Sequence, residues 1–361
     1  MAIRNHRALL TALGLGVVLW FGSAVVHAAW TRAAGPTGLV GLVAPTTPAV
    51  SLVRGAGSAG GSQVLATIAF LAVLAALVLP AVRATRTGAA ARVLAAWFAV
   101  IVAGWAAATL QTLATIGMFR GYAIRDLLAL GVGEPVRTGW AWGVSYGWVV
   151  ALATVAVARR SEQQAGGEQQ AGSGPALGAP AAAVTAGVVA AIGWLVAALA
   201  HVAVDDTVNQ YVTTARSQFA LSVRVSADWL LPVTTAGGAP GGVVLLGALL
   251  VGAVVGTLAW LAARTTVLQG GRLVLFLGVW AAAIVGAVVG GLPTALASTG
   301  LDPEGDGRWA IGQGQLYGPS DGGAAGAFYG WIPALLVVGL LVWTQRRVPA
   351  VEPSADTAAH A

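Results

Sequence analysis

Two histidines and two arginines occupy matching places in the two parts of this sequence, and they are its main candidates for chemistry. His27 and His201 coincide when the chain is aligned with itself so that Trp20 meets Trp194. Two neutral imidazoles brought together could bind a metal or flank a haem iron. The alternative is a histidine that bonds a neighbouring helix or a lipid headgroup at the membrane interface. Because the chain has no cysteine, and no methionine pair or carboxylate stands at ligand spacing, we expect no metal and no cofactor.

Arg125 and Arg308 coincide in a second alignment of the chain with itself, which we call the repeat register. Each of them falls in a segment predicted to be an outer loop. The planar guanidinium suits a phosphate or a carboxylate, so the pair could contact an anionic substrate or a lipid headgroup. The alternative is an interfacial arginine that faces water and headgroups. Asp126 follows Arg125, but Trp309 stands at the matching place, which argues against a catalytic acid.

A formal match to the nucleophile elbow of hydrolases, G-x-S-x-G, occurs at Gly143–Gly147. That motif works only at a sharp strand-to-helix turn, with a histidine and an acid nearby. Here the motif opens an apolar helix, and the matching segment Gly326–Gly330 has no serine. We therefore interpret these glycines as packing residues, since small residues four apart let helix backbones approach closely in lipid. The predicted packing glycines are Gly143, Gly147, Gly252, Gly256, Gly286, Gly290, Gly326 and Gly330.

The elements that must position these residues are long apolar segments. The sequence is 57% hydrophobic and only 9% charged, with a mean hydropathy of +0.81, which is typical of a chain solvated by lipid. The apolar runs are continuous rather than alternating, so they predict helices and not a barrel. We predict an all-α integral membrane protein with about eight spans. The predicted spans are Ala8–Trp30, Val64–Val82, Val93–Met118, Ala141–Ala158, Ala181–Val204, Gly241–Ala263, Leu273–Ala297 and Ala324–Thr344.

The distribution of arginine predicts the orientation. With the N-terminus inside, the inner segments contain 11 arginines and 4 acidic residues, whereas the outer loops contain 8 arginines and 9 acidic residues. The positive-inside bias then predicts a multi-pass protein of the cell membrane with both termini in the cytoplasm. Topology accounts for the basic charge, so we expect no nucleic-acid partner. No charged residue falls in the middle of a predicted span, which argues against an ion-coupled transporter.

The repeat register also indicates an internal duplication. It pairs Trp97 with Trp280 and aligns Tyr146–Trp148 with Tyr329–Trp331 without a gap. The simplest account is a duplicated four-helix unit, in which the two copies share one orientation and are related by a pseudo-two-fold axis along the membrane normal. A shared site would form between the copies.

This repeat divides the chain into four parts. They are a first membrane repeat (1–160), a flexible cytoplasmic linker (161–180), a second membrane repeat (181–347) and a disordered cytoplasmic tail (348–361). The longest loops, 31–63 and 205–240, are predicted on the outer side, where Val208–Leu231 suits a helix lying at the interface.

Two functional classes fit these observations. The first is an accessory or scaffold subunit of a cell-envelope membrane complex, with membrane lipids and a membrane-protein partner. The second is a transporter or lipid-handling protein whose outward-facing site lies between the repeats and uses Arg125, Arg308, His27 and His201. We do not expect an enzyme, since no nucleophile, acid pair or metal centre has a plausible place. A filled centre would favour the first class, and an outward cavity lined by the matched polar pairs would favour the second.

Overall fold

The computed structural model describes residues 2–34, 49, 60–85, 87–115, 124–164, 178–215, 241–266, 268–299 and 322–346. Every regular element in these residues is a helix. The short helix Gly322–Tyr329 directly precedes the last labelled helix. The labelled helices are α1 (Ala2–Ala34), α4 (Gly60–Arg83), α5 (Ala89–Thr115), α6 (Ile124–Gln163), α7 (Ala179–Ala215), α9 (Gly241–Ala263), α10 (Leu268–Thr299) and α12 (Trp331–Arg346).

Among the described residues, seven helices are each long and apolar enough to cross a membrane. An eighth span is formed if Gly322–Tyr329 and Trp331–Gln345, which meet at a 42° bend, are counted as one. The structure thus confirms that the described part of the chain is all-helical, with seven to eight helices suited to a multi-pass membrane protein.

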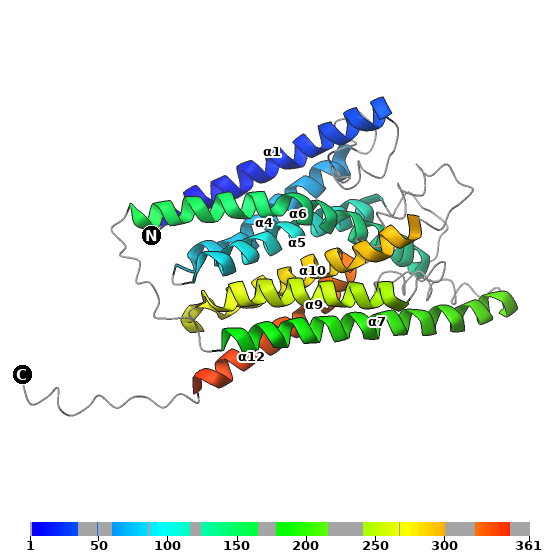
Figure 1. Ribbon diagram of the computed structural model, residues 1–361. Helices are drawn as coiled ribbons and strands as arrows, with labels where there is room; N and C mark the ends of the chain where they lie inside the picture. The colour runs from blue at the N-terminus through cyan, green and yellow to red at the C-terminus, as the bar shows by residue number, and fades with distance from the viewer. Residues whose placement is uncertain are drawn as a thin grey trace, which may run out of the picture.

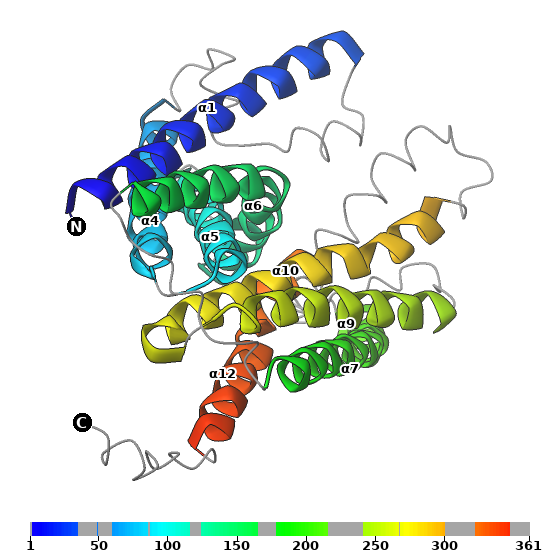
Figure 2. The same ribbon diagram turned by 60° about the vertical axis from the view of Figure 1, so that its left-hand side comes forward.

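The helices form a bundle with α5 and α10 at its centre. In their most apolar windows, 61% of α5 and 67% of α10 is buried inside the protein, against about a third or less of α1, α4, α7 and α9. Helix α5 contacts α4, α6 and α10, whereas α10 contacts α5, α9 and α12. Figures 1 and 2 show α1 and α7 on opposite flanks of the bundle. The third helix of each predicted repeat, and not the first, therefore forms the junction between the halves.

The helices run up and down, so that charged helix ends gather at one end of the bundle. At this end α1, α5, α7 and α10 begin, and α4, α6, α9 and α12 end (Figure 1). We call it the arginine-rich end, because Arg83, Arg92, Arg160, Arg264 and Arg272 lie at these helix termini.

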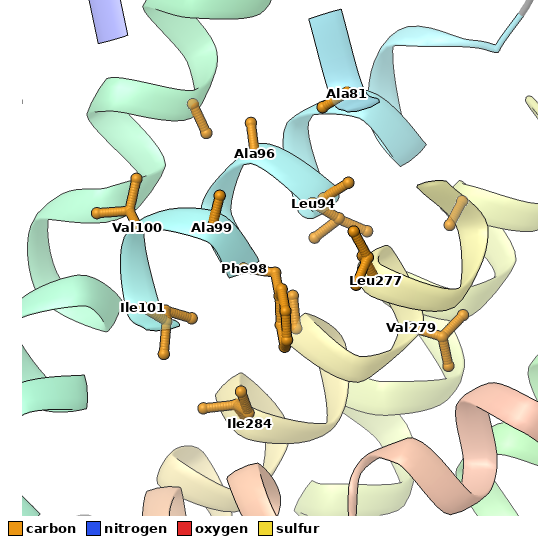
Figure 3. Close-up of a cluster of buried hydrophobic side chains, with 14 of the residues drawn as sticks. Ala81, Leu94, Ala96, Phe98, Ala99, Val100, Ile101, Leu277, Val279 and Ile284 are labelled. Atoms are coloured by element: carbon orange, nitrogen blue, oxygen red, sulfur yellow. The ribbon is translucent and has the colours of Figure 1, made fainter. Parts of the chain in front are cut away.

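Side chains fill the junction between the two central helices. The rings of Phe98 on α5 and Trp280 on α10 lie 4.8 Å apart. A Cβ atom on Gly278 would lie 3.3 Å from Cβ of Leu94, so the helices approach to van der Waals contact. Figure 3 shows Leu94 and Phe98 of α5 facing Leu277 of α10 within this cluster.

Three predicted boundaries differ from the structure. Helix α6 begins at Ile124, so residues 124–140 are helical and not an irregular outer loop. This segment contains three glycines and Pro135, which are weak helix formers, so local propensity does not explain the extension. Helix α6 also continues to Gln163, into the predicted linker. Helix α7 continues to Ala215 and so includes the first residues of the predicted interfacial helix, whose remainder lies outside the described residues.

Candidate functional site

The two histidines lie far apart in the bundle. His27 is buried on α1 and His201 is buried on α7. These helices occupy opposite flanks, with α5 and α10 between them (Figure 2). The structure therefore does not bring the histidines together, because the first helix of each half lies outermost. In the described parts of the chain, no group of three or more His, Asp or Glu residues could hold a metal ion.

The matched arginines fall largely outside the described residues. Arg125 lies in the first turn of α6, but its side chain is not among those described, and the same holds for Asp126. Arg308 lies wholly outside the described residues. Their contact with a substrate or a headgroup stays a prediction.

Ser145 lies in the middle of α6, which is helical from Ile124 to Gln163. The sharp strand-to-helix turn that a nucleophile elbow requires is therefore absent at this position. Four of the glycines around and opposite it lie against the central helices. A Cβ atom on Gly147 would lie 2.7 Å from Cδ1 of Trp97, and one on Gly330 would lie 2.6 Å from Cδ1 of Trp280.

The contacts of Gly143 and Gly326 are also alike. A Cβ atom on Gly143 would press against Cα of Ile101, and one on Gly326 would lie 2.7 Å from Cα of Ile284. Both obstacles are backbone atoms, which no side-chain rotation can remove. A side chain at either glycine would force two helices apart.

The other four predicted glycines lie where α9 meets its neighbours. Cβ atoms on Gly252 and Gly256 would lie 3.2 Å and 3.1 Å from backbone oxygens of Gly187 and Ala183 on α7. On α10, a Cβ atom on Gly286 would lie 3.3 Å from the oxygen of Val251, and one on Gly290 would lie 3.0 Å from the oxygen of Gly247. All eight glycines thus face another helix at short range.

An ion pair between a buried arginine and a partly exposed glutamate at the arginine-rich end was missed by the sequence analysis. Arg92, in the first turn of α5, is only 1% exposed. Its guanidinium donates two hydrogen bonds to Glu162, at 3.0 and 3.2 Å. It donates two more to the backbone oxygens of Ala81 (3.0 Å) and Val82 (3.2 Å). One side chain therefore joins the end of α4, the start of α5 and the end of α6.

This ion pair changes the interpretation of the predicted linker. Glu162 is one of its first residues, yet its carboxylate accepts both bonds of a bidentate pair. Charge-assisted bidentate bonds are strong and geometrically specific. Two features of the sequence point to this pair. Arg92 stands inside an otherwise Ala- and Val-rich helix, and Glu162 is the first acidic residue after the span Ala141–Ala158.

The connections α4–α5 and α9–α10 interlock at the same end. The backbone N–H of Gly88 donates a hydrogen bond to the oxygen of Thr265 (2.6 Å). In return, a Cβ atom on Gly271 would lie 2.8 Å from Oγ1 of Thr87. Each connection therefore places a glycine against the other connection, and these contacts join the two halves.

The halves also touch toward the opposite end. The ring of Trp140 on α6 lies directly against Gly323, and the rings of Trp105 and Phe328 lie 6.3 Å apart. Within the described residues, the buried Nε1 atoms of Trp105 and Trp140 and Oγ1 of Thr109 have no hydrogen-bond partner. An unsatisfied buried donor costs about 1–3 kcal/mol, so this region could take up a group that accepts hydrogen bonds.

The last span is broken beside this region. Proline has no N–H and its ring collides with the carbonyl of the residue four positions earlier, so Pro333 explains the 42° bend at Gly330. The indole of Trp280 donates a hydrogen bond to the oxygen of Ala327 (3.0 Å), which fixes the short helix to α10. Broken helices in membrane proteins are tolerated where such contacts satisfy the backbone.

The junction between the halves is therefore the candidate site. Side chains fill it along α5 and α10, and contacts between two connections hold it together at the arginine-rich end. Toward the opposite end, it contains buried polar atoms without a hydrogen-bond partner. Comparison with known proteins finds no protein-family model, no curated protein and no solved structure that matches the chain.

Proposed function

We propose that this protein is an accessory or scaffold subunit of a membrane complex in the cell envelope. The observation that carries the proposal is the filled junction between the halves, where Phe98 packs against Trp280 and Leu94 lies against Gly278. A subunit that holds a complex together needs a rigid bundle and no internal path. The membrane partner would lie against the apolar flanks.

The contacts at both ends of the junction support this choice. Transporters built from parallel repeats work by rocking one half against the other around a central site. Here the bond from Gly88 to Thr265 holds one end, and the packing of Trp140 on Gly323 holds the other. Rocking in either direction would have to break one of these contacts.

We further propose that the bundle consists of two tandem four-helix repeats, residues 1–160 and 181–347. Three glycine contacts of α6 recur at the matching places of the second half. They are the contacts of Gly139 with Gly104, Gly143 with Ile101 and Gly147 with Trp97. Their counterparts in the repeat register are Gly322 with Ala287, Gly326 with Ile284 and Gly330 with Trp280. Recurrence of contacts, and not only of residue types, supports a duplicated unit.

Two further pairs fit a pseudo-two-fold axis along the bundle. Residues on such an axis contact their own counterparts. Trp140 lies against Gly323, which is its counterpart in the repeat register. Leu94 and its counterpart Leu277 both belong to the core cluster where α5 meets α10 (Figure 3).

The orientation in this proposal places the arginine-rich end and both termini in the cytoplasm. Because the chain contains no cysteine, single cysteines can report it. An Asp302→Cys variant should react with a membrane-impermeant maleimide on intact cells, and an Asp356→Cys variant should react only after permeabilisation. The reverse pattern would show the opposite orientation.

The test of the scaffold function is affinity purification in mild detergent, with mass spectrometry of the proteins and lipids that are retained. We expect a membrane protein in stoichiometric amount. A chain that purifies alone with a bound lipid or small anion would contradict the proposal. Loss of that ligand in an Arg125→Ala, Arg308→Ala double variant would then identify a transporter or lipid handler.

An engineered cross-link tests the rigid junction directly. A Cβ atom on Gly271 would lie 3.9 Å from Cβ of Thr87, which is within the range of a disulfide. A Thr87→Cys, Gly271→Cys variant should therefore form a disulfide under mild oxidation and still bind its partner. A Thr87→Cys, Gly339→Cys variant is the control, because Gly339 faces open space. Loss of partner binding on cross-linking would show that the halves must move.

The alternative, a transporter or lipid-handling protein, is favoured by the unsatisfied atoms of Trp105, Thr109 and Trp140 beside the broken span. A ligand bound there should lose hydrogen bonds in a Trp105→Phe, Trp140→Phe variant. Lipid mass spectrometry of this variant and of the wild type would reveal the difference, and identical lipid profiles would count against a site at this position.

A further inference from the structure

The arginine-rich end carries an uncompensated positive surface. The side chains of Arg7, Arg83, Arg160, Arg264 and Arg272 are exposed there. Glu162 is the one carboxylate at this end with a described side chain, and Arg92 already engages both of its oxygens. The exposed guanidinium groups therefore have no acidic counterpart in the described part of this end.

The interlocked connections bring the backbones next to two of these arginines to the same short segment. Arg264 directly precedes Thr265, which contacts Gly88, and Arg272 directly follows Gly271, which contacts Thr87. Because Thr87 and Gly88 are consecutive, residues 265 and 271 are brought to the same short segment. The backbone segments that carry Arg264 and Arg272 therefore flank the contact between the α4–α5 and α9–α10 connections.

Exposed apolar side chains lie next to both arginines. The guanidinium carbon of Arg264 lies 4.5 Å from the centroid of the Trp260 ring, and that tryptophan is 37% exposed. Leu273, beside Arg272, is 54% exposed. Stacking on an aromatic face orients the planar guanidinium and leaves its donors available. The α9–α10 hairpin therefore presents cationic and apolar surface side by side.

We propose that the ends of α9 and α10 bind an acidic phospholipid, with Arg264 and Arg272 contacting its phosphate and with Trp260 and Leu273 contacting its acyl chains. Basic clusters at the ends of membrane helices bind anionic headgroups in this way. The exposed apolar side chains fit a lipid better than an acidic protein segment, because they lie where acyl chains would continue from the phosphate. The inference does not depend on the scaffold function.

The matching hairpin, formed by the α4–α5 connection, has no arginine at the places equivalent to Arg264 and Arg272. In the α4–α5 connection Arg83 is exposed, but Arg92 is buried and its donors point to Glu162 and the end of α4. In the repeat register, Arg264 and Arg272 align with Ala81 and Ala89, so the pair on the second hairpin has no equivalent; Arg86, also in the α4–α5 connection, lies outside the described residues. Among the described residues, we therefore expect the preferential lipid site on the α9–α10 hairpin.

The test uses the purified full chain in a neutral detergent. Native mass spectrometry would measure binding of phosphatidylglycerol, with phosphatidylcholine as the uncharged comparison. An Arg264→Gln, Arg272→Gln variant should bind phosphatidylglycerol about thirtyfold more weakly, since each arginine near an anionic headgroup contributes about fivefold. Arg32→Gln is the matched control, because Arg32 is an exposed arginine at the opposite end of α1.

Several outcomes would overturn the proposal. Unchanged phosphatidylglycerol binding by the double variant would do so, as would an equal loss in Arg32→Gln. Displacement of the lipid by glycerol 3-phosphate at equal concentration would indicate a soluble anion instead. Arg264→Lys keeps the charge but lacks the planar group, so a partial loss is expected; a full loss would make stacking, not charge, the source of affinity. The Arg264→Gln, Arg272→Gln variant and the Arg32→Gln variant should both elute from gel filtration as the wild type does.

Discussion

Arg92 and Leu275 occupy equivalent places in the two halves of the bundle in the repeat register, and both are buried. Arg92 bonds Glu162 and the end of α4. The counterpart of Glu162 is Gln345, which is exposed, and Leu275 lies in the apolar core. Equivalent positions in the two halves thus accommodate either an ion pair or an apolar contact, provided that a buried charge has its hydrogen-bond partners.

The halves also differ in how their outermost helices pack. In the first half, Trp20 stacks on Phe70 with ring centroids 4.5 Å apart, and Trp142 meets both rings edge-on. The indole of Trp142 also donates a hydrogen bond to Ser23 (2.9 Å). In the second half, α7 and α9 approach through glycines. Figure 2 accordingly shows α1 diverging from the bundle and α7 running alongside α9.

A third difference lies in the fourth span of each half. Val150 stands in the continuous helix α6, and its counterpart Pro333 follows the break at Gly330. The difference between valine and proline at this position therefore accompanies a continuous span in the first half and a bent span in the second. Each of these three differences can be tested by amino-acid substitution.

The largest effect is expected from Arg92→Leu, which gives the first half the residue of the second. Glu162, whose side chain is 26% exposed, would lose its cation, and the buried oxygens of Ala81 and Val82 would lose their donor; together these losses cost about 3–5 kcal/mol. Thermal unfolding in detergent, followed by size-exclusion chromatography of a fluorescent fusion, should show a lower midpoint. Adding Glu162→Gln should recover part of the loss. An exposed control, Arg83→Gln, should change little, and equal midpoints for Arg92→Leu and wild type would refute the role of the pair.

Exchanging the fourth-span residues should have the next largest effect. Val150→Pro removes a backbone donor and inserts a ring into α6, at a cost of about 3 kcal/mol or more. Pro333→Val should instead reduce the 42° bend, because Tyr329 regains a backbone partner. Spin-label distances across the last span would report the bend. An unchanged distance in Pro333→Val would place the cause of the break elsewhere.

A smaller effect is expected from side chains at the packing glycines. Gly143→Val and Gly326→Val both press a Cβ atom against a backbone Cα of a central helix, and overpacking costs about 1–3 kcal/mol. Similar losses of thermal stability in the two variants would support equivalent contacts in the two halves. A loss in only one half would break the comparison.

The smallest effect, and of opposite sign, is expected at Gly14 on α1. A Cβ atom there would meet no other atom within 4 Å. Replacing a helical glycine by alanine gains about 1 kcal/mol of helix propensity, so Gly14→Ala should unfold at a slightly higher temperature. A marked loss would show that this face of α1 is covered by another helix in the assembled protein.

The sequence predicted most helices because lipid leaves the backbone few choices. Gly241–Ala263 was predicted with the bounds that α9 has, and the small-residue pattern indicated glycines that face other helices. Residues 124–140 were missed because their charged residues lower the hydropathy, and their three glycines and Pro135 lower the helix propensity, so the local sequence gives no signal for the extension. The candidate site was predicted less well, since His27 and His201 lie on opposite flanks and Arg308 lies outside the described residues.

The amino-acid sequence was enough to establish the class of protein and the approximate number of its apolar helices, since a segment of about 20 apolar residues in lipid can satisfy its backbone only as a helix. The tertiary structure alone decided that α5 and α10 are central, that Arg92 bonds Glu162, and that the two short connections interlock. The physical reason is that lipid and protein interior are about equally apolar. A buried helix face and a lipid-facing one therefore have similar compositions, and only shape decides which helices meet.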